Sequence, residues 1–233
     1  MASFQYDARI IENYPSLVAG LIVARDLSNP PSSPDLRNAY LAEQATVKAR
    51  IGNTPLSELP SLSAWRRAIS AFGVSPTRYR SAAEALLRRL TKKGDIPCIN
   101  TLVDIGNLVS IRYGLPVAVM DTQQIALPIT VHYSDGSEAY TELRSAEVMN
   151  PAPGEVIFSD TTQMVVARRW CWRQSFSSAA KQTTNDVVIA IEAHHDGARP
   201  DIENALADML SLLSAQAGGE HESAVLNREN TAI

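Results

Sequence analysis

Hydrophobic residues recur at helical spacing through most of the first half of the chain. Residues 35–51, 61–72, 81–93 and 102–113 each place apolar side chains three or four positions apart, which predicts four helices. Residues 17–24 are short, apolar and rich in β-branched side chains, as a buried strand is. Residues 4–14 fit a short strand or a turn of helix. The leading region is therefore predicted to be mostly helical.

After residue 121 the hydrophobic period shortens to two. This change predicts strands at residues 125–133, 139–143, 155–158, 163–169 and 187–192. Asp135 followed by Gly136 is typical of a two-residue hairpin turn between the first two strands. Residues 200–216 form a last amphipathic helix that must dock on the sheet. The whole pattern predicts an α+β fold with helices packed over a mixed or antiparallel sheet, a helical N-terminal half and a β-rich C-terminal half.

Composition limits the class of protein. With 233 residues, 45% of them hydrophobic, the chain can bury the core of one domain, expected at 1–217, and the polar residues 218–233 are expected to be disordered. No run of about 18 apolar residues is present, and the first residues lack the basic and apolar pattern of a signal peptide. Cys98 and Cys171 suggest neither a disulfide framework nor a metal site. We expect a cytoplasmic protein with no membrane partner.

Positive charge is concentrated in one segment. Residues 66–93 contain eight cationic side chains and one glutamate, a local charge of +7 on a chain whose net charge is −4. This asymmetry favours a surface that faces phosphates, such as those of an RNA, although a basic helix face is often only solvated. The candidate phosphate-binding residues are Arg78, Arg80, Arg88, Arg89, Lys92 and Lys93.

The helix predicted at 102–113 is apolar around most of its circumference and should be largely buried. At about 100° per residue, Asn100, Asp104 and Asn107 fall within a sector of about 60°. Buried polar groups need partners, and two explanations are open. The three side chains could cap the helix and hold neighbouring loops, or they could line a small-molecule pocket.

His194 and His195 precede Asp196 at the end of a predicted strand. Adjacent strand residues point to opposite faces, and no third ligand has suitable spacing. We therefore expect a turn here, with no metal and no cofactor.

Several short segments, taken in order, resemble the B3/B4 domain of the phenylalanyl-tRNA synthetase β subunit, and proteins that carry this domain alone. They are residues 78–81, 86–90, 96–97, 99–100, 102–104, Asn107, 115–116, 120–121, 153–156, Asp160, 169–175 and Thr184. The resemblance spans roughly residues 16–215. It implies one compact α+β unit. The chain is too short to hold an aminoacylation domain as well, so a complete phenylalanine–tRNA ligase is not expected.

In the synthetases this domain hydrolyses tyrosine wrongly attached to the tRNA for phenylalanine. The resemblance assigns catalytic positions to Asn107 and Asp104. It gives Asp121 and Thr184 matching positions in the family. Together with Asn100 from the helix and Arg173 and Gln174 from the 170–175 run, they are the candidate substrate-binding residues. Aminoacyl esters are activated and the neighbouring ribose hydroxyl can assist, so hydrolysis would need neither a metal nor a nucleophilic side chain.

Two departures from the family pattern bear on activity. Ala118 occupies the position of the family's editing histidine, and residues 170–175 replace a glycine-rich segment that carries a glutamate. Two hypotheses follow. The chain could be a free-standing editing protein that hydrolyses mischarged aminoacyl-tRNA in trans. It could instead be a non-catalytic module that binds tRNA or a small amino-acid ligand. DNA is not an expected partner, and a small-molecule enzyme on the same fold stays open.

Overall fold

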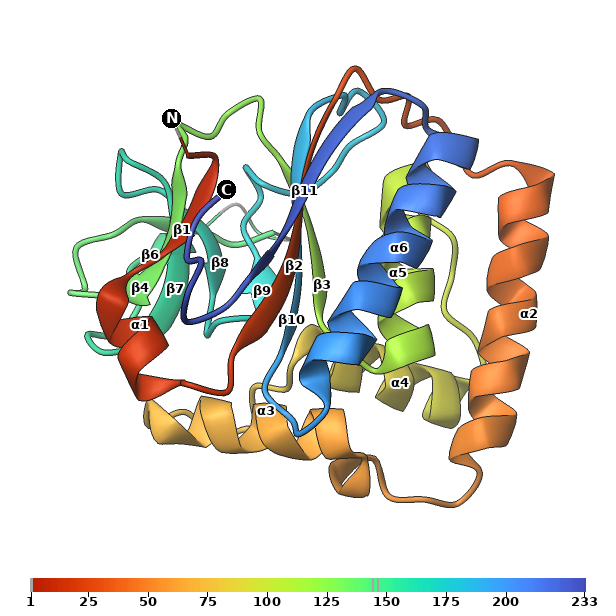
Figure 1. Ribbon diagram of the computed structural model, residues 1–233, viewed down its shortest axis with the longest axis horizontal. Helices are drawn as coiled ribbons and strands as arrows, with labels where there is room; N and C mark the ends of the chain where they lie inside the picture. Colours follow the sequence, from red (N-terminus) through yellow and green to blue (C-terminus); the bar gives the residue numbers. More distant parts are fainter. Residues whose placement is uncertain (1, 144, 146) are drawn as a thin grey trace.

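A computed structural model of the protein describes residues 2–143, 145 and 147–233 (Figure 1). The helices in this part of the chain are α1 (Ala8–Asn13), α2 (Pro34–Ile51), α3 (Pro60–Ala71), α4 (Ala82–Lys93), α5 (Thr101–Tyr113) and α6 (Ala198–Gln216), with a 3-10 turn at Leu56–Glu58. No helix among the described residues is long and apolar enough to cross a membrane. The predicted helices are confirmed, α3 beginning at Pro60 without a side-chain cap.

Two main sheets form the β structure. One has the order β1-β4-β7-β8-β9 and the other has the order β11-β2-β10-β3. The strands of the first are β1 (Phe4–Tyr6), β4 (Ile129–Tyr133), β7 (Val156–Ser159), β8 (Val165–Arg168) and β9 (Arg173–Gln174), and those of the second are β2 (Val18–Arg25), β3 (Val117–Asp121), β10 (Val187–Ala193) and β11 (Glu220–Leu226). Strands β5 (Tyr140–Thr141) and β6 (Val148–Met149) pair separately.

The β11-β2-β10-β3 sheet is the middle layer of the molecule, with helices α2, α4, α5 and α6 beyond one face and the five-stranded sheet beyond the other (Figure 1). Alternation along β10 explains this arrangement. Ile189 and Ile191 enter the core shared with the helices, whereas Val188 and Ala190 enter the core shared with the other sheet. A strand that is apolar on both faces must be covered on both, so the fold has three layers. The predicted α+β class is confirmed.

Helices α4 and α5 begin after residues whose side chains cap a helix and end at glycines. The Ser81 hydroxyl accepts a hydrogen bond from the Glu84 amide, and the Asn100 side chain accepts one from the Val103 amide. Gly94 and Gly114 end these helices in the left-handed conformation. Glu84 does not complete a capping box with Ser81, because its carboxylate binds Arg66 at 2.8 Å instead.

The predicted hairpin at residues 125–143 is wrong. Strand β4 begins only at Ile129, after a cis Leu127–Pro128 peptide bond, and it pairs with β1 and β7. Strand β5 pairs with β6. The turn at Asp135 and Gly136 therefore exists without joining paired strands. Buried Glu138 explains this, because it binds the Ser134 hydroxyl and the Gly136 amide and folds the segment on itself.

The expected disordered tail is also wrong for residues 220–226. These residues form β11, which pairs with β2 over seven positions from Glu220 opposite Arg25 to Leu226 opposite Ala19. Leu226 is fully buried in the core between the two sheets. The first four residues of this edge strand are exposed or half-buried and polar, so composition alone could not distinguish the segment from a disordered tail.

Leu226→Ala should therefore destabilise the protein by about 2–5 kcal/mol, because it opens a cavity in a buried core. The matched change Glu222→Ala, at an exposed position of the same strand, should stay within about 0.5 kcal/mol of the wild type. Urea unfolding of both variants measures the difference. Equal and negligible effects would show that this strand does not form.

Candidate functional site

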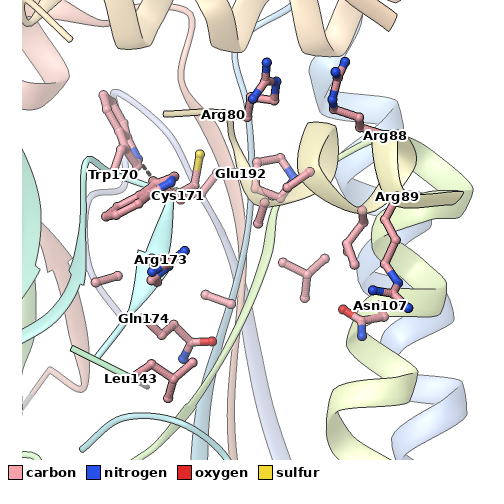
Figure 2. A pocket seen from close by; sticks show the side chains of 18 of the residues that line it. Arg80, Arg88, Arg89, Asn107, Leu143, Trp170, Cys171, Arg173, Gln174 and Glu192 are labelled. Atoms are coloured by element: carbon pink, nitrogen blue, oxygen red, sulfur yellow. Dashed lines mark hydrogen bonds between the residues drawn. The ribbon is translucent and has the colours of Figure 1, made fainter. Parts of the chain in front are cut away.

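A cavity of about 700 Å³ lies where the end strand β3 of the central sheet approaches the end strand β9 of the other sheet. Helix α4 and the segment before it border the cavity, and Asn107 reaches it from α5. In Figure 2, Arg89 and Asn107 lie across the open space from Arg173 and Gln174. The Gln174 amide ties the two end strands together by donating to the Val119 carbonyl at 2.9 Å.

Cationic side chains gather at this cavity. All six predicted phosphate-binding residues line it, together with Arg173: Arg78, Arg80, Arg88, Arg89, Lys92 and Lys93. We call these seven the rim cations. Three are held by carboxylates: Arg80 by Glu84 at 3.5 Å, Arg89 by Asp95 at 3.8 Å and Arg173 by Glu142 at 2.8 Å.

Four rim cations, Arg78, Arg88, Lys92 and Lys93, have no carboxylate within 4.0 Å among the described residues. All four are exposed. Their charge is therefore available to a ligand, whereas the three paired arginines are already oriented. Arg66 and Arg67, the other cations of the basic segment, lie outside the cavity: Arg66 binds Glu84, and Arg67 binds the Ser63 hydroxyl.

The three polar residues predicted to lie together at α5, Asn100, Asp104 and Asn107, have two different surroundings. Asn100 caps the helix and donates to the Ala180 carbonyl, and Asp104 accepts from the Ser32 hydroxyl and the Ile99 amide. These two side chains are buried and are absent from the cavity lining. Asn107 lines the cavity, and its amide makes no hydrogen bond of normal geometry in the described part of the chain, although the Tyr40 hydroxyl lies beside it.

The remaining predicted substrate residues also separate. Arg173 and Gln174 line the cavity, whereas Asp121 and Thr184 do not. The Thr184 hydroxyl donates to the Asp121 carboxylate and accepts from the Lys181 amide, and the other Asp121 oxygen accepts from the Gln123 amide. These bonds close the loop between β9 and β10. Asp121 and Thr184 therefore hold the scaffold beside the site.

A strained turn carries aromatic side chains to the cavity. Arg169 and Trp170 have φ values of 48° and 60°, in the left-handed region that costs a non-glycine residue about 1–3 kcal/mol. Three hydrogen bonds hold the turn: the Trp170 amide to the Val156 carbonyl, the Arg169 amide to Glu155, and the Ala82 amide to the Cys171 carbonyl. Of residues 170–175, only Arg173 and Gln174 form a strand.

Arginines and aromatic rings alternate beside the turn. The Arg169 guanidinium lies 3.7 Å from the Tyr79 ring centroid and 4.6 Å from that of Trp172, and the Arg173 guanidinium lies 4.5 Å from the Trp172 centroid. Such stacking holds a guanidinium without neutralising it. Arg173 is therefore fixed by both Glu142 and Trp172.

Glu192 lines the bottom of the cavity from β10 and is 2% exposed. One carboxylate oxygen accepts hydrogen bonds from the Tyr6 hydroxyl at 2.7 Å and the Trp170 indole at 2.9 Å; Figure 2 draws the indole contact. Burial raises the pKa of Glu192 to about 7, and these two donors only partly oppose the shift. The carboxyl group therefore exchanges a proton near neutral pH.

The neighbours of Glu192 stay uncharged. Burial and the nearby Glu192 carboxylate raise the pKa of the Cys171 thiol well above its ordinary value. Burial lowers the pKa of His194 to about 3, and its ring lies 4.5 Å from that of Trp65 and 5.0 Å from that of Trp170. His195, the other histidine of the pair, binds Asp201 at 2.9 Å. The described residues contain no cluster of three side chains able to hold a metal ion.

Glu192, Trp170 and Cys171, which lie at the bottom of the cavity, are not among the site residues predicted from the sequence. Glu192 looked like the last polar residue of a strand, and only its pairing with Tyr6, 186 positions away, shows its surroundings. A signal was present, because the residues before Glu192 are continuously apolar and a carboxylate ending a doubly buried strand is unusual.

The chemistry of the cavity changes with depth. Its rim is cationic, its walls include Phe158, Leu86 and Ala118, and its bottom holds one carboxyl group. This order suits a ligand with a phosphate group at one end and an apolar part that enters the protein.

Comparisons with known proteins agree with the resemblance seen in the sequence. A model of the family described as the B3/4 domain matches residues 64–205. The phenylalanine–tRNA ligase beta subunit of Shewanella oneidensis is 25% identical over 116 residues, which are 50% of this chain and 14% of that protein. A crystal structure of an N-terminal fragment of the phenylalanyl-tRNA synthetase beta subunit from Pyrococcus horikoshii covers 94% of this chain and 50% of that chain, with a TM-score of 0.48 and 12% identity.

Replacing Glu192 by glutamine should change how stability depends on pH. Because the pKa of Glu192 is raised from 4.5 to about 7, the folded state keeps a proton that the unfolded state loses between these values. The wild type therefore loses stability as the pH rises through this window. Glutamine cannot titrate, so Glu192→Gln should gain on the order of 3 kcal/mol relative to the wild type between pH 4.5 and 8.

Urea unfolding at several pH values measures this gain. His194 titrates near pH 3 in both proteins, so its contribution cancels in the difference. A difference that does not vary with pH would contradict the burial of a titrating Glu192.

Proposed function

The chain belongs to the B3/4 domain family, and we propose that it binds the acceptor end of an aminoacyl-tRNA and hydrolyses the ester of a wrongly attached amino acid. The observation that carries this proposal is the single cavity that joins the rim cations to a largely apolar interior. An aminoacylated RNA end has the same order of parts, with phosphates at one side of the ester and an amino-acid side chain at the other. The chain spans 14% of the length of the curated relative, so aminoacylation is not proposed.

The rim supports phosphate binding in two ways. The paired arginines, Arg80, Arg89 and Arg173, are held by carboxylates and can present fixed donors to phosphate oxygens. The exposed Arg88, Lys92 and Lys93 add charge that attracts a polyanion before contact. The rest of the chain is acidic, because the net charge is −4 although the basic segment alone carries +7. A polyanion should therefore approach this face.

Asn107 is the best-placed side chain for the hydrolytic step. It lines the cavity and its amide can both donate and accept, so it can orient a water molecule against the ester carbonyl. Asp104 is not part of this proposal, because its carboxylate is bound to Ser32 and the Ile99 amide away from the cavity. Hydrolysis would then rest on positioning and on the ribose hydroxyl of the substrate.

Binding without hydrolysis is the second candidate function. Ala118 lines the cavity at the position where the resemblance expects a histidine, so a hydrogen-bonding group is missing from its wall. A module of this kind would retain the rim and the pocket and would hold an aminoacyl-tRNA or an amino-acid ligand without turnover.

Charge reversal of Arg88, Arg89, Lys92 and Lys93 together should weaken tRNA binding by at least about 100-fold at low salt, because each lost phosphate contact removes counterion release. The logarithmic dependence of affinity on salt should become shallower in the same variant. Filter binding or fluorescence anisotropy between 50 and 300 mM salt measures both quantities.

The matched control reverses four exposed arginines outside the cavity, Arg9, Arg25, Arg199 and Arg228, which gives the same change in net charge. This control should bind nearly as the wild type does. If the two variants lose the same affinity, only the overall charge matters and the rim is not the binding site.

A panel of mischarged aminoacyl-tRNAs tests the hydrolytic step. We expect release of the amino acid above the uncatalysed rate for at least one, and a loss of about 10- to 100-fold in Asn107→Ala. Asp104→Asn should keep the activity of the folded protein while lowering its stability by about 1–3 kcal/mol, because it disturbs a buried hydrogen-bond pair.

If no amino acid is released from any substrate while tRNA binding is intact, the result would favour binding without hydrolysis. Greater loss of activity in Asp104→Asn than in Asn107→Ala, at matched folded fractions, would contradict the assignment of roles.

A further inference from the structure

One oxygen of the Glu192 carboxyl group lacks a hydrogen-bond partner in the described part of the chain, at a place that a ligand can reach. The oxygen Oε1 accepts both hydrogen bonds, from Tyr6 and Trp170, whereas Oε2 accepts none from any residue that the structure describes. The side chain nevertheless lines the cavity. Oε2 is not among the fully buried atoms without a partner, so it is open to the cavity and free to accept a hydrogen bond from a ligand there.

We propose that Oε2 of Glu192 binds a protonated amine of the ligand at the bottom of the cavity. The proposal deepens the proposed function and rests on it for the identity of the ligand as an aminoacyl group. The ligand would then be bipolar, with its phosphates at the rim cations and its amine at the carboxylate.

The charges around Glu192 favour an amine over a neutral donor. No arginine, lysine or histidine in the described chain lies within 4.0 Å of its carboxylate, so the protein supplies no counter-charge. A buried carboxylate is costly without one. An ammonium group would provide that charge together with a strong hydrogen bond, whereas a hydroxyl would provide only the bond.

The groups that face Glu192 cannot replace the ligand in this role. Tyr6 and Cys171 have pKa values well above their ordinary ones, and His194 has a pKa of about 3, so all three are neutral between pH 5 and 8. Trp65 approaches from α3 but donates its indole hydrogen to the Glu192 backbone carbonyl. Within this cluster, Glu192 alone changes charge over that range.

Two amines of an aminoacyl group could reach the carboxylate, the α-ammonium or an amine at the end of the side chain. Non-hydrolysable 3′-aminoacylamido analogues of adenosine monophosphate separate them. The norleucyl analogue carries only the α-amine, the Nα-acetyl-lysyl analogue only the side-chain amine, the lysyl analogue both and the N-acetyl-norleucyl analogue neither. Calorimetry gives the affinity of each for the wild type and for Glu192→Gln.

We expect analogues that carry the recognised amine to bind the wild type with at least tenfold higher affinity than the N-acetyl-norleucyl analogue does. This difference in affinity should be lost in Glu192→Gln. The affinity of the recognised analogue should also be greater at pH 8 than at pH 5.5, because the carboxylate must lose its proton. An affinity advantage that survives in Glu192→Gln would overturn the proposal, and equal affinity of all four analogues for the wild type would overturn the aminoacyl group as the ligand of this site.

A second probe separates this proposal from the function on which it rests. Butylammonium, compared with butanol, is titrated into the protein while the Glu192 carboxyl carbon is followed by NMR. Binding of the amine alone, with a lowered Glu192 pKa, would support the amine site even if no analogue and no tRNA binds. Absence of any difference between the amine and the alcohol, together with equal analogues, would overturn the amine site even if tRNA binding is intact.

Discussion

The burial of β10 on both faces is the constraint on which the other features of the molecule depend. Its seven residues, Val187–Ala193, are all buried, so the sheet needs helices on one side and a second sheet on the other. Alternation along this strand assigns each side chain to one core. Val188 and Ala190 point toward the second sheet, and Glu192 follows them in the same row. A carboxyl group thereby enters an apolar interlayer space, where Tyr6 and Trp170 are its hydrogen-bond donors.

The cavity exists because both sheets end at the same place. Strand β3 is an edge of one sheet and β9 an edge of the other, and the two are joined there by the Gln174 contact to the Val119 carbonyl. The strained turn at Arg169 and Trp170 places an indole beneath this opening, and the bond from the Ala82 amide to the Cys171 carbonyl links the turn to the start of α4. Because α4 is anchored at that point, its basic face borders the opening. The rim and the bottom of the site are thus positioned by different layers.

The sequence predicted those features of the fold that depend on residues close together in the chain, such as helix ends and buried strands. Ser81 and Asn100 cap their helices, Gly94 and Gly114 end them, and the apolar runs became strands β2, β7, β8 and β10. Six of the eight cations of the basic segment line the cavity, whereas Arg66 and Arg67 lie outside it. Long-range pairing escaped prediction: β11 was indistinguishable from a polar tail, and Asp135–Gly136 resembled a hairpin whose strands pair elsewhere. The bottom of the cavity was missed for the same reason, since Glu192 acquires its partners from β1 and the 169–172 turn.

Asn100, Asp104 and Asn107 show that the position of a polar residue along α5 determines whether it holds the fold or faces the cavity. Asn100 and Asp104 lie at the N-terminal end, where free amides and the incoming chain offer nearby partners, and both are consumed by the Val103 and Ile99 amides and by Ser32. Asn107 lies one turn further on, where every helix amide is already bonded, and the neighbouring surface is the open edge beside β3 rather than a loop. Its amide is therefore left for the cavity. Helical periodicity grouped the three residues, but only the end of the neighbouring sheet determines which of them faces the cavity.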